Sequence, residues 1–281
     1  MTELAGSAVQ AVCAALLDMG LAAAIGLLVL FPRLERASVT ALARTTGRWL
    51  GLAAPAYVAV AVCVMSGAGP ADLPAALGTV LMHTGFGHVQ CLLLAGCALF
   101  ACALRLAGAR GRLAAMAVGA LMMLVARAGT GHAADAGWTG AAIWIHGAHV
   151  LAVSAWAGAV FVVVLAQRQP PGPALAHRLS SVSTWALALA FGAGAVGALD
   201  TLSAARAPWG SDYLFWLLLK FAGVALAVAL GAFNRWARLP GLCRGNAAAA
   251  GSFRRILLAE AGVLVLVVAA AARLGLTMPP G

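Results

Sequence analysis

The sequence has few charged residues. Asp, Glu, Lys and Arg make up only 9% of its 281 residues, whereas hydrophobic residues make up 63% and the mean hydropathy is +0.98. An ordinary soluble domain carries roughly 25% charged residues. This composition excludes a soluble globular protein and predicts an all-α polytopic membrane protein embedded in a lipid bilayer.

Acidic residues are the scarcest of the charges, with 8 Asp and Glu against 18 Lys and Arg, which gives a net charge of +10. A basic excess can indicate a nucleic-acid partner. Here, however, the bases are confined to short segments between apolar runs, without the clustered basic face that phosphate binding requires. We therefore exclude nucleic acid as a partner and interpret the charge as a topology signal.

Motifs of common enzyme chemistry are also absent. The sequence has no nucleotide-binding loop, no HExxH, no GxSxG and no paired-carboxylate hydrolase pattern. Its six cysteines form no CxxC pair and most lie inside apolar runs, where cysteine behaves as a small hydrophobic residue. We expect no enzyme, no disulfide framework and no zinc site, so any transport would be passive, ion-coupled or driven by a partner.

Long apolar runs dominate what is present, and a rule of roughly 20 residues per span predicts about eight transmembrane helices. Their approximate bounds are 8–31, 49–67, 76–104, 113–129, 140–166, 179–203, 212–234 and 254–275. The third run is interrupted at HTGFGH (83–88), which predicts a short outer helix before the span proper. The first three residues include no base, so we expect the first run to be a span rather than a signal peptide.

The bases mark one side of the membrane. Most lie in four alternate loops, at Arg33, Arg36, Arg44 and Arg48, at Arg105, Arg110 and Arg112, at Arg168 and Arg178, and at Arg235, Arg238, Arg244, Arg254 and Arg255. The positive-inside rule places these loops in the cytoplasm and both termini outside. Of the six histidines, all except His177 then fall toward the outer face.

A weak internal repeat is visible. The segment GRLAAMAVGALMMLVARAG resembles FRRILLAEAGVLVLVVAAA in placement, and in the same register Asp18 corresponds to His149. We expect a single transmembrane domain over 1–281, and we interpret the repeat as a 4+4 parallel arrangement with halves 1–130 and 131–281, a layout that can place a site between halves. The alternative is that Ala- and Leu-rich helices align with one another readily.

The stretch from 130 to 158 holds the most suggestive polar residues. A loop with His132 and Asp135 leads into an apolar helix that carries His146 and His149 one turn apart on one face. Two such imidazoles can ligate one metal, and imidazole with carboxylate suits Cu²⁺ or Zn²⁺. The alternative is that outer histidines sit at the polar interface and that the loop is solvated, although ionisable groups at membrane depth usually mark function.

Two further histidines, His83 and His88, flank the glycines of the interrupted third span. In a regular helix they would point to different faces, so a shared metal requires the turn to bend. Farther along that span, Cys91 and Cys102 share a stripe with His88, and such a ladder can carry reduced copper inward. An incidental turn and ordinary helix packing are the alternatives for these two groups.

Asp18 lies roughly ten residues into the first span, near mid-depth at ~1.5 Å per residue. A carboxylate there costs ~2.5–3.5 kcal/mol, so it should face the interior and be paired, protonated or metal-bound. With Met19 beside it, it can serve an ion path, and a structural hydrogen bond is the alternative. We expect Lys220 to be its charge partner and Glu260 to be a second buried carboxylate nearer the inner face.

Several segments together resemble the copper resistance D (CopD) family of bacterial inner-membrane proteins. They are GHAAD (131–135), the spacing from His149 to Trp156 followed by Gly158, YLFWLLLK (213–220), FNRWARLP (233–240) and FRRILLAEAG (253–262). The resemblance runs over about 75–280. It implies a multi-pass protein of copper homeostasis, eight spans in the inner membrane, and a periplasmic copper-binding partner of the CopC type.

By position, the resemblance assigns family roles to His132, His149, Lys220, the pair Asn234-Arg235 and Glu260. The chain departs from the family pattern in two places: Asp18 stands where we expect a histidine, and His146 is additional.

Three hypotheses follow. In the first, a periplasmic donor delivers copper to an outer metal site of His132, Asp135, His146 and His149, with His83 and His88 nearby, and the ion descends past Asp18 and Trp156. In the second, histidines of the third and fifth spans are the axial ligands of a b-type haem. In the third, the protein is a membrane anchor that docks a periplasmic copper chaperone through the 127–139 loop without transporting copper.

Overall fold

The computed structural model describes residues 2–130, 138, 140–204 and 212–277, and within them it contains helices and no strands. The elements are α1 (Thr2–Leu30), η1 (Phe31–Arg33), α2 (Arg36–Ser66), α3 (Leu73–His83), α4 (Gly85–Cys102), η2 (Ala103–Arg105), α5 (Ala109–Ala128), α6 (Ala141–Ala166), α7 (Pro173–Ala204), α8 (Asp212–Phe233), η4 (Asn234–Arg238), α9 (Leu239–Cys243) and α10 (Ala247–Leu274).

Eight of the described helices are long and apolar enough to cross a membrane, which confirms the predicted number of spans. The predicted interruption of the third span is also confirmed, since α3 ends at His83 and α4 begins at Gly85. Thr84 separates them with an extended backbone, and its hydroxyl oxygen accepts a hydrogen bond of 2.9 Å from the Gly87 amide. This hydroxyl caps the new helix by satisfying one of its first free N–H groups.

The centre of the bundle is the crossing of α1 and α6, whose side chains are among the most buried in the chain. Gly26 and Gly158 lie at this crossing. A Cβ atom on Gly26 would overlap the Gly158 carbonyl group, and one on Gly158 would overlap the carbonyl oxygen of Ala22. Membrane helices gain packing energy by close backbone approach, which small residues permit. This glycine pair therefore sets how closely α1 and α6 pack.

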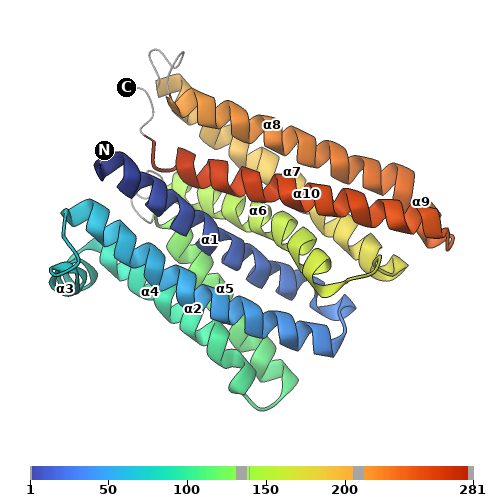
Figure 1. Ribbon diagram of the computed structural model, residues 1–281, viewed down its shortest axis with the longest axis horizontal. Helices are drawn as coiled ribbons and strands as arrows, with labels where there is room; N and C mark the ends of the chain where they lie inside the picture. Colours follow the sequence, from blue (N-terminus) through green and yellow to red (C-terminus); the bar gives the residue numbers. More distant parts are fainter. Residues whose placement is uncertain (1, 131–137, 139, 205–211, 278–281) are drawn as a thin grey trace.

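The remaining spans flank this central pair on its two sides (Figure 1). Helices α2, α4 and α5 pack together on one side, while on the other α7 packs on α6 and α8 packs on α10. Helix α8 is peripheral, because Ala227 is its one buried residue among those described and it exposes several large apolar side chains. We assign that exposed surface to lipid. The division into half-repeats stays a prediction.

The start of α1 and the end of α10 lie at the same end of the bundle (Figure 1). At the opposite end, α2, α4 and η2 surround an open hollow lined by Arg44, Arg48 and Arg105. These bases belong to the loops that the positive-inside rule assigns to the cytoplasm. We call this end of the bundle the inner end, and the outer location of both termini stays a prediction.

Candidate functional site

Asp18 on α1 forms an ion pair with Arg127 on α5. The Arg127 Nε and Nη2 groups donate to the two carboxylate oxygens at 2.7 and 2.9 Å, a bidentate geometry typical of strong Arg–carboxylate pairs. The guanidinium also lies over the Tyr57 ring, 5.6 Å from its centroid, and its Nη1 donates to the Thr130 hydroxyl at 3.1 Å. Arg127 thus connects Asp18 to the beginning of the loop that follows α5.

The expectation that Lys220 is the charge partner of Asp18 is therefore wrong. The physical reason is packing: α1 lies against α5, whereas α8, which carries Lys220, packs on α10. Sequence reasoning gave Arg127 no role. The signal was available, because an arginine within an apolar run at membrane depth is costly unless it is paired.

His149 on α6 is oriented by α7. Its Nδ1 donates a hydrogen bond of 3.0 Å to the carbonyl oxygen of Ala190, since a carbonyl oxygen can only accept. The ring lies against Gly194, where a Cβ atom would approach Nδ1 to 3.2 Å. A donating Nδ1 leaves Nε2 as the nitrogen that can accept a proton or bind a metal. Backbone carbonyls commonly fix metal-binding histidines in this way.

His146 and His149 share an electrostatic environment with charges from three other helices. The charges of Asp18, Arg127 and Lys220 all act on His146, and that of Lys220 also acts on His149. The outer half of α6 therefore lies within electrostatic range of charged residues on α1, α5 and α8, although α8 itself packs on α10. Both histidines are half-buried.

A second polar contact lies deeper, where α6, α8 and α10 meet. The indole Nε1 of Trp156 donates to Glu260 Oε1 at 3.2 Å, and both side chains are buried. A Cβ atom on Gly231 of α8 would lie 3.2 Å from the same oxygen. Among the described residues Glu260 has no cationic partner within salt-bridge distance. A buried carboxylate without a paired positive charge is costly at membrane depth, so Glu260 is a candidate functional residue.

The structure does not bring the other predicted ligands that it describes to His146 and His149. His83 is exposed at the end of α3, and the exposed His88 donates its Nε2–H to the Met82 carbonyl oxygen at 3.2 Å. Helix α3 packs on α2 and α4, so these histidines are not brought to α6. Met19 is half-buried and packs against the core. His132 and Asp135 lie outside the described residues.

No group of three or more His, Cys, Asp or Glu residues within the described ranges is close enough to hold a metal ion. The histidine–thiol stripe of α4 does not provide one either. Cys91 directs its Sγ at the Leu81 carbonyl oxygen at 4.0 Å, and Cys102 is exposed at the inner end of α4.

The segment FNRWARLP forms the inner end of α8 and continues as the π-helix η4. Buried Asn234 donates to the Phe253 carbonyl oxygen at 3.1 Å, which ties η4 to α10. Arg235 Nη1 donates to Oγ of Ser180 and Oγ1 of Thr184, each at 2.8 Å, which ties η4 to α7. π-Helical turns are rare and frequently occur at functional sites. In this π-helical turn, Asn234 contacts α10 and Arg235 contacts α7.

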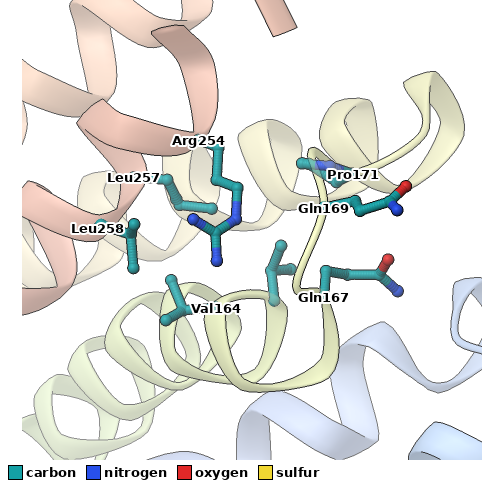
Figure 2. A pocket seen from close by; sticks show the side chains of 8 residues that line it. Val164, Gln167, Gln169, Pro171, Arg254, Leu257 and Leu258 are labelled. Carbon is teal, nitrogen blue, oxygen red and sulfur yellow. The ribbon is translucent and has the colours of Figure 1, made fainter. Parts of the chain in front are cut away.

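A small pocket lies at the inner ends of α6 and α10. Figure 2 shows the Arg254 side chain reaching from α10 into the space bordered by Val164 of α6 and by Gln167, which follows the end of α6. Leu257 and Leu258 complete the α10 side of the pocket. It lacks the histidines and carboxylates of the candidate site and lies at the other end of the helices.

Comparison with known proteins gives one match. The family model described as copper resistance protein D matches residues 173–274, from the first residue of α7 to the last of α10. The matched region includes Lys220, Asn234, Arg235 and Glu260, but not His149. No curated protein and no solved structure matches the chain.

Proposed function

The copper resistance protein D family model matches residues 173–274, and from this premise we propose that the chain is a member of that family and moves copper across the membrane from a periplasmic donor. Membership makes it a copper-related membrane protein, and its eight membrane-competent helices agree with this. In the proposal, copper is cargo. It first binds at the outer half of α6 and then passes inward between α6, α8 and α10.

The observation that carries the proposal is the orientation of His149. Because its Nδ1 donates to Ala190, its Nε2 is available as a ligand without any change of tautomer. His146 stands one turn earlier on the same helix and supplies a second imidazole. The proposed outer site consists of these two histidines together with His132 and Asp135. The hydrogen bond from Arg127 to Thr130 supports this assignment, since it anchors the chain immediately before that loop.

The positive charges near His146 mean that a copper ion bound there needs an additional negative charge. Arg127 and Lys220 each carry a positive charge near His146. The nearby negative charge that the structure describes, on Asp18, is already paired with Arg127. Like charges repel a cation most strongly where the dielectric constant is low. We therefore assign Asp135 the role of offsetting this repulsion. Copper leaving the histidines then competes with Arg127 for the carboxylate of Asp18.

Glu260 is the next candidate ligand on the inward route. It is the buried carboxylate that lacks a cationic partner in the described part of the chain, and Trp156 orients it by donating to Oε1. Trp156 lies seven residues after His149, two turns farther along α6. Both Trp156 and Glu260 are therefore assigned to the ion path, and Lys220 sets the positive potential at its entrance.

The docking-anchor hypothesis remains the rival reading, because a copper chaperone of the CopC type could bind the same outer loop without any ion crossing. The haem hypothesis has less support from the packing. His83 and His88 lie on α3 and α4, which pack on α2 and α5 rather than on α6. Two axial ligands from the third and fifth spans are therefore not positioned face to face.

Copper stoichiometry of the purified full-length protein tests the site. We expect His149→Ala and His132→Ala each to lose the outer copper ion, whereas His83→Ala, on the helix that packs elsewhere, keeps it. Size-exclusion profiles identify any variant that fails to fold. Unchanged copper stoichiometry in both His149→Ala and His132→Ala would contradict the site assignment. A Soret band in the wild-type protein would support the haem hypothesis instead.

A further inference from the structure

A thiol and an imidazole lie in contact at the inner end of the bundle, away from the site described above. Cys243 Sγ of α9 and His177 Nε2 of α7 are 3.2 Å apart, although 66 residues separate them in sequence. Both side chains are exposed. The copper pathway proposed above uses neither residue.

The backbone beneath this pair is held firmly. Helix α9 buries Leu239 and Leu242, and a Cβ atom on Gly241 would lie only 2.7 Å from the Ala249 Cβ of α10. After Cys243 the chain turns through Gly245 at φ 78°, a left-handed conformation that glycine adopts without strain, and Asn246 N then donates to the Gly241 carbonyl oxygen at 3.0 Å. The backbone at Cys243 is therefore fixed, while the exposed Cys243 and His177 side chains can rotate at the surface.

We infer that Cys243 and His177 form a Cu⁺ binding site at the inner end of the protein. Thiolate and imidazole are both copper ligands, and a soft thiolate selects the reduced ion. Cu⁺ is satisfied by two donors, whereas a structural Zn²⁺ site takes four. No third His, Cys, Asp or Glu of the described residues joins the pair. A two-donor site of this composition therefore favours Cu⁺ over Zn²⁺.

The binding step balances without a redox partner. Cu⁺ bonds to Sγ and to the lone pair of Nε2, and the thiol proton leaves to water, so metal uptake releases one proton. Copper remains Cu⁺ throughout. Sγ and Nε2 already point at each other across a hydrogen bond, so a small rotation of the two side chains admits the ion.

The position of the pair indicates what the site does. It lies at the end of the bundle that carries the basic loops, opposite the outer histidines. As an exit site, a role that rests on the proposed function, it would present Cu⁺ to a soluble thiol carrier by ligand exchange. The binding of Cu⁺ itself does not depend on that function.

The test is an anaerobic Cu⁺ titration of the reduced full-length protein against a colorimetric Cu⁺ chelator. Cys243→Ser and His177→Ala are each expected to lose one equivalent of Cu⁺ relative to wild type. Cys102→Ser is the matched control, because its thiol is also exposed at the inner end but has no histidine contact in the described structure. Since both proposed ligands are at the surface, the variants are expected to give the wild-type size-exclusion profile.

Two results would overturn the inference: equal Cu⁺ binding by wild type, Cys243→Ser and His177→Ala, or an equal loss in Cys102→Ser, which would indicate unspecific thiol binding. The outer-site variant His149→Ala separates this inference from the proposed function. If His149→Ala binds as much copper as wild type while Cys243→Ser loses one equivalent, the outer site is wrong and the inner site stands. The reverse pattern rejects the inner site alone.

Discussion

The ion pair between Asp18 and Arg127 allows a quantitative prediction. Its side chains are 27% and 17% exposed, respectively, so the pair is mostly but not fully removed from solvent. Removing one partner of a buried pair costs ~3–5 kcal/mol, whereas exposed pairs contribute ~1 kcal/mol or less. We therefore expect Asp18→Asn to lower the free energy of unfolding by about 2–3 kcal/mol, because it leaves the Arg127 charge without a carboxylate.

A double-mutant cycle isolates the pair. Adding Arg127→Gln to Asp18→Asn is expected to restore part of the loss, with a coupling energy of about 2 kcal/mol. Lys220→Met is the control, and its effect should add to that of Asp18→Asn within ~0.5 kcal/mol, since the two residues are not paired. The measurement is unfolding in mixed detergent micelles followed by the circular dichroism of the helices. A coupling energy near zero with Arg127, or a large one with Lys220, would refute the reasoning.

Two further predictions concern the centre of the bundle and the inward route. Gly158→Ala should lower the unfolding free energy by ~1–3 kcal/mol through overpacking against α1, whereas Gly192→Ala, where a Cβ atom would meet nothing within 4 Å, should be neutral in the same unfolding assay. Trp156→Phe removes the hydrogen bond to Glu260 and should reduce copper flux into proteoliposomes while the outer copper stoichiometry is unchanged. Trp185→Phe, at a tryptophan that is 78% exposed, is its control, and equal flux in the two variants would contradict the role of Glu260.

Much of the fold was predictable because the length of an apolar run indicates whether it can span the membrane. The eight spans and the break at HTGFGH follow from apolar runs and glycines. The apolar run predicts that the second span starts at residue 49, whereas α2 begins at Arg36. The first turns of α2, which carry Arg44 and Arg48, come before the apolar run. A hydropathy rule does not include such polar turns in the span.

The candidate site was less predictable because it depends on which helices pack together. Periodicity placed His146 and His149 on one face, but the orientation of His149 comes from a carbonyl group of α7 that no local pattern indicates. The partner of Asp18 depends on α1 lying beside α5, and the contact of Cys243 with His177 depends on α9 docking beside α7. Each of these is a contact between segments far apart in the sequence.

Copper flux into proteoliposomes tests most directly the central claim that this protein moves copper. We predict that vesicles containing the wild-type protein accumulate copper well above empty vesicles, that His149→Ala falls to the empty-vesicle level, and that His83→Ala retains wild-type flux. If the wild-type protein gives no flux above empty vesicles while it still binds copper at the outer histidines, the protein is a docking anchor and the transport account is contradicted.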